Sequence, residues 1–193
     1  MSDKVKIKKI RNVLPVLSTF PIEDSTKKLI KIPDEIEYTG NLFVFIDNPV
    51  YEKIHIHANS DLNHEVGGVL IGDYNKDLFG TEFIIITDIL SQDSSESEHA
   101  AHIVFTHKFW MIVDKYLDQN QGKLVLGCYH THPRFGVFLS GTDRATILNS
   151  FNQPHHVAIV IDPVNKTEGY FVWGNREEPV EVQIMITDKT DDK

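Results

Sequence analysis

The sequence predicts one domain of the α/β or α+β class, with a single curved sheet and helices on its faces. Its 193 residues match the length of one ordinary domain. Short apolar runs of strand length recur along the chain. Between two of them, apolar residues recur at the helical spacing i, i+3, i+4, i+7 and i+8, at Phe109, Ile112, Val113, Tyr116 and Leu117. Strands and helices mix without strict alternation, which favours these two classes.

The chain divides into an N-terminal arm at residues 1–40, a folded domain at 41–187 and a polar tail at 188–193. The arm mixes Lys-rich and Pro-containing stretches, with a short strand at Val5–Ile10. The first strand of the domain ends at Asn48-Pro49, where proline suits the first turn of a helix. The predicted elements are, in order, strand Asn41–Asp47, a helix from Pro49 to about Asn59, strand Val66–Gly72, a turn at Asp73–Gly80, strand Glu82–Ile89, an acidic loop at Ser91–Ala101, a helix over Phe109–Leu117, strand Lys123–His130, a helix start at Asp143–Ser150, and strands His156–Asp162, Gly169–Trp173 and Val180–Ile186.

Composition excludes several classes of protein. Hydrophobic residues make up 41% of the chain and charged residues 24%, close to the globular norm, which argues against disorder. Apolar runs such as Phe83–Ile86 are far shorter than the roughly 18 residues that a membrane span needs. The charged N-terminus has no apolar stretch behind it, so we expect no secretory signal. The single cysteine, Cys128, rules out an internal disulfide and the Cys-rich zinc fingers, and we expect a cytoplasmic protein without a membrane partner.

Charge is distributed unevenly along the chain. Residues 1–40 carry eight Lys/Arg and six Asp/Glu, a net of +2, whereas the other 153 carry eleven against twenty-two, a net of -11. This acidic body makes nucleic acid a poor partner. It favours a basic partner, or it serves only to keep the chain soluble.

The segment richest in chemistry is HTHPRFGVFLSGTD, from His130 to Asp143. Side chains alternate along a strand, so His130 and His132 at its end point to the same face. Pro133 ends the strand, and Asp143 adds a carboxylate in the first turn of the next helix. Two imidazoles and one carboxylate would leave Zn²⁺ a net positive charge and a fourth position for water. Catalytic zinc sites have this arrangement, whereas structural zinc sites have four protein ligands.

Two more residues would complete a hydrolytic site. Glu65 begins the VGGVLIG strand, and its carboxylate could take a proton from water and pass it to a leaving amine. Ser140 could donate its hydroxyl to a developing oxyanion. The spacing from Ser140 to Asp143 is equally that of a capping pair at a helix start, and both interpretations can hold together.

Other reactive side chains are predicted to lie outside this chemistry. His55 and His57 form a second H-x-H pair, but in a helix residues two apart point about 200° apart and cannot share a metal. Cys128 is predicted to be a small buried filler. The remaining histidines are predicted to be surface or loop residues, with His64 a candidate to tune Glu65: His64, His99, His102, His107, His155 and His156.

Glu65 and the pattern H-x-H-P-x6-S-x2-D from His130 to Asp143 resemble the JAMM motif of the JAB/MPN+ metalloproteases. EVGGVLIG at Glu65–Gly72 and GCYHTHPRFGVFLSGTD at Gly127–Asp143 are similar to that family's signatures, and the resemblance covers roughly Asn41–Trp173. It implies an MPN/JAB-like α/β fold, with one curved mixed sheet flanked by helices in a single domain. It also implies a Zn²⁺ cofactor on the two histidines and the aspartate.

The family hydrolyses isopeptide bonds to ubiquitin or ubiquitin-like proteins, and it includes deubiquitinases of the proteasome lid and the signalosome. The small size of this chain is more similar to free-standing bacterial members, encoded beside ubiquitin-like, E1-like and E2-like proteins. The resemblance therefore implies a zinc-dependent isopeptidase that cleaves after the C-terminal tail of a ubiquitin-like protein. E1-like and E2-like proteins would be its pathway partners, with antiviral defence as one candidate role.

Two other functions remain open at this point. The chain could be a peptidase that trims a ubiquitin-like or sulfur-carrier precursor, or a non-catalytic MPN scaffold, although scaffold members typically lack the ligands that this chain has.

Arg134 stands where many relatives have a small residue, and Cys128 where eukaryotic ones often have an aromatic. Only about a dozen residues separate Asp143 from the strand at His156, so the family's second insertion is nearly absent and selection among ubiquitin chain linkages is not expected.

The acidic loop Ser91–Ala101 occupies the place of the family's first insertion, which in relatives can pair with the extended tail of ubiquitin. It contains Asp93, Glu96 and Glu98 and no Lys or Arg. Pairing between strands uses backbone hydrogen bonds, which do not depend on the side chains. Any preference for a particular tail must therefore come from side-chain contacts and from the electrostatic field of the protein. The loop either favours a tail with Arg or Lys before its terminal glycine, or is a solvated linker.

Overall fold

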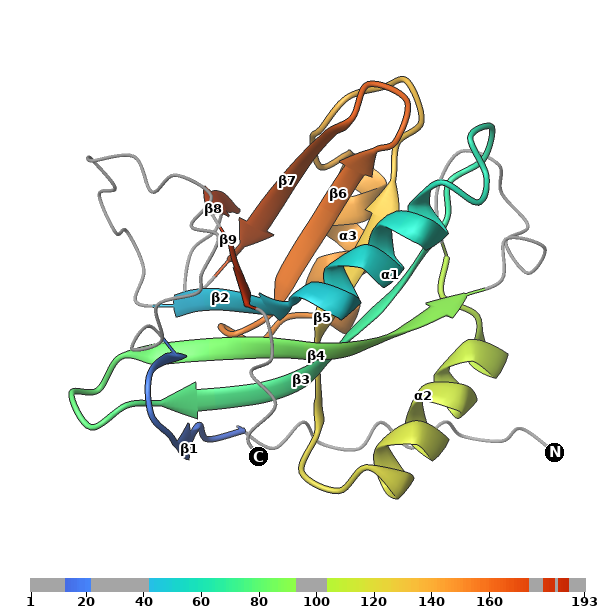
Figure 1. Ribbon diagram of the computed structural model, residues 1–193. Coiled ribbons are helices and arrows are strands. Elements are labelled where there is room, and N and C mark those ends of the chain that lie inside the picture. Colours follow the sequence, from blue (N-terminus) through green and yellow to red (C-terminus); the bar gives the residue numbers. More distant parts are fainter. Residues whose placement is uncertain (1–12, 22–41, 93–103, 174–178, 183, 188–193) are drawn as a thin grey trace, which may run out of the picture.

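The computed structural model describes residues 13–21, 42–92, 104–173, 179–182 and 184–187. Within them, nine strands form one sheet and three helices cover its faces (Figure 1). The elements are β1 (Val16–Leu17), β2 (Leu42–Asp47), α1 (Asn48–Ala58), β3 (Gly67–Lys76), β4 (Glu82–Gln92), α2 (His107–Gln119), β5 (Leu124–Thr131), α3 (Gly141–Ser150), β6 (Val157–Asp162), β7 (Thr167–Val172), β8 (Val180–Val182) and β9 (Ile184–Thr187).

The sheet is mixed and strongly curved. Its strand order is β8-β7-β6-β5-β3-β4-β2-β9, with β1 paired to β3 off this path. β2 runs parallel to β4, and β5 parallel to β6, whereas β3 is antiparallel to both β4 and β5. One residue separates β8 from β9, yet these strands pair at opposite ends of the order, with β7 and with β2. The two edges of the sheet must therefore lie close together, which nearly closes it.

Two apolar cores lie on the two faces of the sheet. α1 packs its buried Val50, Ile54 and Ala58 against one face. α2 and α3 pack Phe109, Val113 and Ile147 against the other face, together with alternate residues of β3, β5 and β6. Residues of one strand contribute to both cores because their side chains alternate: Val69 lies on the α2–α3 side and Leu70 on the α1 side. The predicted fold class is confirmed.

Glycines allow the central strands to approach one another closely. A side chain on Gly68 would collide with the carbonyl of Leu90 and the ring of Tyr129. Gly127 has φ 140°, and a Cβ there would collide with the carbonyl of Val157 in β6. The β3–β5 register shifts beside this glycine, between Leu70 and Ile71, so the bend of β5 towards the site depends on it.

Part of the N-terminal arm packs on the domain. Val16 and Leu17 form β1, which pairs parallel with β3, and Ser18 N–H donates to the Lys76 carbonyl at 3.0 Å. The ring of Phe20 packs edge-on against Phe43, Phe45 and Phe83 at centroid distances of 4.9, 5.4 and 5.3 Å. The strand predicted at 5–10 and the polar tail at 188–193 lie outside the described residues.

Three predicted strands differ from the structure by more than two residues at one end or by a division into two strands. β3 extends to Lys76 because Tyr74 and Asn75 are buried and pair with β4, so the predicted turn at 73–80 shrinks to a short one around Asp77. That carboxylate accepts the N–H groups of Phe79 and Thr81. β4 continues through Gln92 into the predicted loop. The single strand predicted at 180–186 is in fact two strands, β8 and β9.

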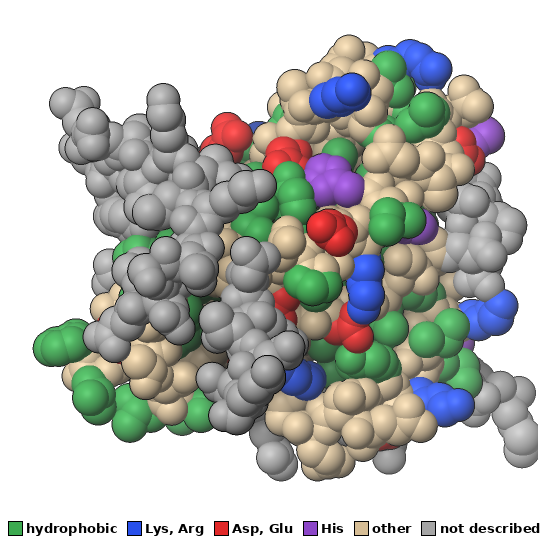
Figure 2. Space-filling view, in the orientation of Figure 1, with side chains coloured by type: hydrophobic (Ala, Val, Ile, Leu, Met, Phe, Trp, Pro, Cys, Tyr) green, Lys and Arg blue, Asp and Glu red, His purple; other side chains and the backbone are tan. Residues whose placement is uncertain are grey.

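The β3–β4 turn carries exposed apolar side chains. Leu78 and Phe79 are 84% and 95% exposed, and green side chains gather at this lower-left corner in Figure 2. Among the described residues, no helix is long and apolar enough to cross a membrane.

Candidate active site

Three segments bring the predicted site residues together. Glu65 lies two residues before the start of β3, and β3 pairs with β5 so that Gly67 lies opposite His130. His132 follows the end of β5, and Asp143 is the third residue of α3. Strand pairing therefore positions the carboxylate of Glu65 beside the two imidazoles, and α3 brings the second carboxylate to them.

The side chains converge in a buried cluster. Nε2 of His130 lies 3.5 Å from Oδ1 of Asp143, and Nε2 of His132 lies 3.4 Å from Oδ2. Oε1 of Glu65 lies 3.6 Å from Nε2 of His132. His130, His132 and Asp143 are 2%, 3% and 5% exposed. The side chain of Glu65 is 11% exposed, somewhat more than the side chains of the other three residues.

The electrostatics of the cluster suit a bound cation. Burial alone would raise the pKa of Asp143, but hydrogen bonds and charge from His130 and His132 outweigh it and hold that pKa well below its usual range. Burial alone would lower the pKa of His132, but Asp143 and the charge of Glu65 raise it above its usual value. The imidazole of His132 therefore stands where positive charge is favoured.

The donor set suits a metal ion. His130, His132 and Asp143 each offer one ligand atom, and these atoms all lie within 4.8 Å of one another. Two imidazoles and a carboxylate are ligand types that zinc sites use. Nε2 of His130 is buried, and a buried polar atom needs a partner, which a metal ion would supply. The group could hold a metal.

Ser140 caps α3. Its Oγ accepts the Asp143 N–H at 3.2 Å, while Oδ2 of Asp143 accepts the Ser140 N–H at 2.7 Å, which together form a capping box. The capping interpretation of this pair is therefore confirmed. The cap also orients the carboxylate of Asp143 towards the imidazoles. The hydroxyl hydrogen of Ser140 can still be donated, because a serine hydroxyl both donates and accepts.

Comparison with known proteins gives the family. A family model described as JAB1/Mov34/MPN/PAD-1 ubiquitin protease matches residues 39–156, more than half of the chain. The chain belongs to this JAB family.

Several curated proteins are similar to this JAB chain. The 26S proteasome regulatory subunit RPN11 of Eremothecium gossypii is 29% identical over 131 residues, which cover 67% of this chain and 40% of that protein. The ubiquitin carboxyl-terminal hydrolase RPN11 of Saccharomyces cerevisiae is 28% identical, covering 67% and 41%. COP9 signalosome complex subunit 5 of Candida glabrata is 30% identical, covering 66% and 29%. The matched region thus spans about two fifths or less of these relatives.

A solved structure shares the fold of the JAB chain. The solution structure of a protein from Desulfitobacterium hafniense superposes with a TM-score of 0.61 at 18% identity, covering 77% of this chain and 96% of that one. This likeness supports the curved mixed sheet with flanking helices.

Replacing Ser140 with alanine in the JAB chain should separate its two roles. Loss of the cap should lower the free energy of unfolding by about 1 kcal/mol. Loss of an oxyanion donor should lower kcat about 10²–10³-fold. We expect both, with bound metal retained, because the backbone N–H that holds Asp143 is unchanged. Chemical denaturation and steady-state kinetics measure the two effects, and a stability loss with unchanged kcat would leave Ser140 as a cap only.

The other reactive side chains mostly follow the prediction. His55 and His57 have separate partners: Nε2 of His55 lies 3.0 Å from Oε2 of Glu168, and Nδ1 of His57 lies 2.9 Å from the hydroxyl of Tyr129. Cys128 is a buried free thiol, and burial, with the charge of Asp143 second, raises its pKa. His64 is exposed and bonds to Asp61 at 2.8 Å.

His155 is an exception among the histidines. It lies in a loop as predicted, but it is only 3% exposed and stacks on Tyr74 at a centroid distance of 4.3 Å. Burial lowers its pKa to about 4, so its imidazole is neutral at physiological pH. Asp93, Glu96 and Glu98 lie outside the described residues, and their role in substrate binding stays a prediction.

Sequence reasoning missed Asp162, which supports the loop that follows the two histidines. Its side chain is fully buried, and it accepts the N–H groups of Arg134 and Gly136 at 3.0 and 2.8 Å. It also accepts the N–H groups of Val164 and Asn165 in the β6–β7 turn. The Asp-Pro pair after a buried strand was the only local signal. One carboxylate thus joins two loops of the JAB domain.

Asp162→Asn should destabilise the protein by about 2–3 kcal/mol, because hydrogen bonds to a charged acceptor contribute about 1.5–3 kcal/mol each. Burial would raise the pKa of Asp162, but the N–H groups of Asn165, Arg134 and Gly136 outweigh it and lower that pKa to about 2. This stabilisation is fully present above the unfolded pKa of about 3.9 and is lost as pH falls towards about 2. Urea unfolding between pH 3 and 7 measures it, with the exposed Asp114→Asn as control. Equal stability of Asp162→Asn and wild type at pH 7 would contradict the assignment.

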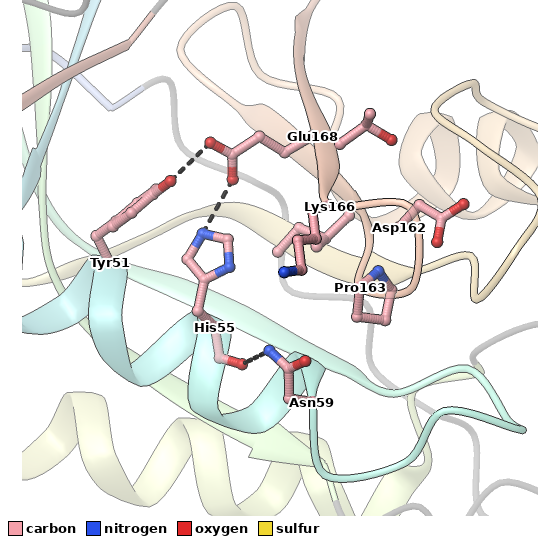
Figure 3. Close-up of a pocket in the computed structure, with 9 residues that line it drawn as sticks. Tyr51, His55, Asn59, Asp162, Pro163, Lys166 and Glu168 are labelled. Atoms are coloured by element: carbon pink, nitrogen blue, oxygen red, sulfur yellow. Dashed lines mark hydrogen bonds and ion pairs between the residues drawn. The ribbon is translucent and has the colours of Figure 1, made fainter.

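A cavity of about 330 Å³ lies between α1 and the β6–β7 turn, apart from the candidate site. Figure 3 shows Tyr51 and His55 of α1 both pointing to Glu168 of β7. The Tyr51 hydroxyl donates to Oε1 of Glu168 at 2.7 Å, and His55 Nε2 meets Oε2 at 3.0 Å. These bonds tie α1 to the sheet, and none of the five predicted catalytic and metal residues lines this cavity.

Proposed function

We propose that this chain is a zinc-dependent isopeptidase that cleaves after the C-terminal tail of a ubiquitin-like protein. The observation that carries the proposal is the buried group of His130, His132 and Asp143 with the carboxylate of Glu65 3.6 Å from one imidazole. A scaffold has no need of three buried ligand groups beside an acid. Membership of a family described as ubiquitin proteases supports the substrate class.

His130, His132 and Asp143 would hold the metal. Zinc, when bound, supplies a Lewis acid that polarises a carbonyl and makes water more acidic. As metal ligands, both imidazoles would be neutral and Asp143 would be ionised, because ligand atoms bind metal in their deprotonated form. The carboxylate is held in place by the cap of α3.

Glu65 would move the proton. Its Oε1 lies 3.6 Å from Nε2 of His132, which places the carboxylate beside the proposed metal ligands. We infer that it accepts a proton from the attacking water and delivers it to the leaving lysine amine. Ser140 would donate its hydroxyl to the oxygen of the scissile carbonyl as negative charge develops there.

The substrate class follows from the relatives and the charge of the chain. One relative is named a ubiquitin carboxyl-terminal hydrolase. We infer that the tail of a ubiquitin-like protein occupies the site here, with E1-like and E2-like proteins acting in the same cytoplasmic pathway. A body of net charge -11 favours a tail that carries basic residues.

Neutralising the acidic loop should therefore weaken binding of a basic tail. Asp93→Asn, Glu96→Gln and Glu98→Gln together should raise KM a few-fold at low salt and leave kcat nearly intact, because long-range attraction between charges is weak and is screened by ions. Kinetics at about 20 and 300 mM salt, with a basic-tailed substrate and its neutral-tailed counterpart, measure this. An unchanged KM at low salt would show that the loop does not contribute to binding of the basic tail.

Two substrates distinguish the proposed function from the alternative of precursor trimming. The purified chain with one equivalent of zinc is incubated with ubiquitin joined through its terminal glycine to a fluorescent lysine peptide, and separately with ubiquitin extended by a peptide past that glycine. We expect the isopeptide conjugate to be cleaved faster. Cleavage of the extended precursor alone would favour trimming, and bound zinc with cleavage of neither would favour a scaffold.

A further inference from the structure

We propose that Thr131 is the residue that positions Glu65 relative to the metal ligands, an inference that rests on the proposed function above. Thr131 is the middle residue of H-x-H, between His130 and His132. Its side chain is not a ligand and does not touch the reacting atoms. It acts through the backbone that carries Glu65.

Thr131 makes two hydrogen bonds to Val66, the residue directly after Glu65. The Thr131 N–H donates to the Val66 carbonyl at 2.9 Å, and the Val66 N–H donates to Oγ1 of Thr131, also at 2.9 Å. Thr131 is 0% exposed and Val66 is 1% exposed. The hydroxyl thus takes a bond that a backbone carbonyl would take in a regular antiparallel ladder. A buried N–H without that acceptor would be strongly disfavoured.

The alternation of side chains along a strand explains why this position suits the task. His130 and His132 project to the metal side, so the residue between them projects to the other side. There it meets the backbone of the segment that enters β3. A single extended triplet therefore holds two metal ligands on one side and the residue next to the proposed proton acceptor on the other.

A second contact holds the same segment on the far side of Glu65. Nη1 of Arg134 donates to the Leu62 carbonyl at 2.8 Å, and Arg134 has φ 73° while its N–H is held by Asp162. This bond is exposed, so its contribution should be small. The buried bond at Val66 is the main anchor, because it lies one residue from Glu65.

The test uses Thr131→Val, which keeps the shape but removes the acceptor, and Thr131→Ser, which restores a hydroxyl. Thr187→Val is the matched control, since that hydroxyl bonds the Ile46 carbonyl on another strand. We expect Thr131→Val to lower kcat about 10–100-fold, because a small misplacement of a reacting group has effects of this size. KM should stay within about twofold, and bound zinc should stay at about one per chain. Thr131→Ser and Thr187→Val should stay within about threefold of wild type.

A double-mutant cycle shows whether Thr131 acts through Glu65. In the Glu65→Gln background, Thr131→Val should cause no further loss of kcat. Losses that multiply would mean that Thr131 acts by another route and would overturn the proposal.

Amide hydrogen exchange measures the anchor without any turnover. The Val66 amide should exchange at least about tenfold faster in Thr131→Val and remain protected in Thr131→Ser. An equally protected Val66 amide in Thr131→Val would overturn the proposal even if activity fell. If wild type cleaves neither ubiquitin substrate, the proposed function fails, whereas the exchange result still decides whether the hydroxyl holds this segment.

Discussion

Replacing His132 with alanine is expected to reduce bound zinc from about one per chain to nearly none and to abolish hydrolysis. The imidazole would supply one of the three proposed protein ligands, and its Nε2 lies 3.4 Å from the carboxylate of Asp143 in a buried group. Changes to residues that merely support metal ligands lower affinity about 10–100-fold, so loss of a ligand should lower it by at least 100-fold. Metal analysis after dialysis, with peptidase assays on the same samples, measures both effects.

The matched control is His107→Ala, the same change at an exposed residue of α2. It should retain zinc and activity. Undiminished zinc in His132→Ala would remove His132 from the metal site and, with it, the assignment of the group.

Glu65→Gln is expected to retain about one zinc per chain and lose activity about 10²–10⁴-fold. The amide keeps the size of the side chain but cannot accept a proton, and general acid–base catalysis contributes factors of this size. The carboxylate of Glu65 lies 3.6 Å from Nε2 of His132, a position that suits proton transfer beside a metal held by that imidazole. Steady-state kinetics and metal analysis on the same preparation measure kcat and the amount of bound zinc per chain.

Glu82→Gln serves as the control for this substitution. Glu82, the first residue of β4, lies outside the ligand group and accepts a hydrogen bond from the hydroxyl of Tyr74 on β3, so Glu82→Gln should leave kcat unchanged. Near-normal turnover of Glu65→Gln would exclude Glu65 as the proton acceptor. Loss of zinc together with activity would instead make Glu65 a ligand.

The metal group could be predicted because it depends on local periodicity. Residues two positions apart on a strand, such as His130 and His132, point to the same face. Asp143, in the first turn of the next helix, needs only a short loop to reach them. The capping box could also be predicted, because Ser140 and Asp143 are three residues apart. Glu65 could be chosen as a candidate because it stands at the start of an apolar strand, and the resemblance to a family supported it. Its position beside His132 depends on the pairing of β3 with β5, which the sequence does not display.

The features that sequence reasoning missed are tertiary. In the sequence, the segment of β8 and β9 looks like a single strand. In the structure the sheet nearly closes, so β8 pairs with β7 and β9 pairs with β2. His155 looks like a polar loop residue until Tyr74 from β3 stacks on it. Asp162 and Thr131 are short polar residues at strand ends, a pattern typical of turns, and their importance lies in the distant backbone groups that they bind.

The most direct test of the account is a zinc titration of the metal-free protein. Zinc is removed from the wild-type chain with a chelator, the loss is confirmed by metal analysis, and hydrolysis of the ubiquitin–lysine peptide conjugate is followed as zinc is added back. The account predicts that the metal-free protein is inactive and that activity rises with added zinc and saturates at about one equivalent per chain, whereas His132→Ala gains none. Full activity in the zinc-free protein, or equal activation of His132→Ala, would contradict it.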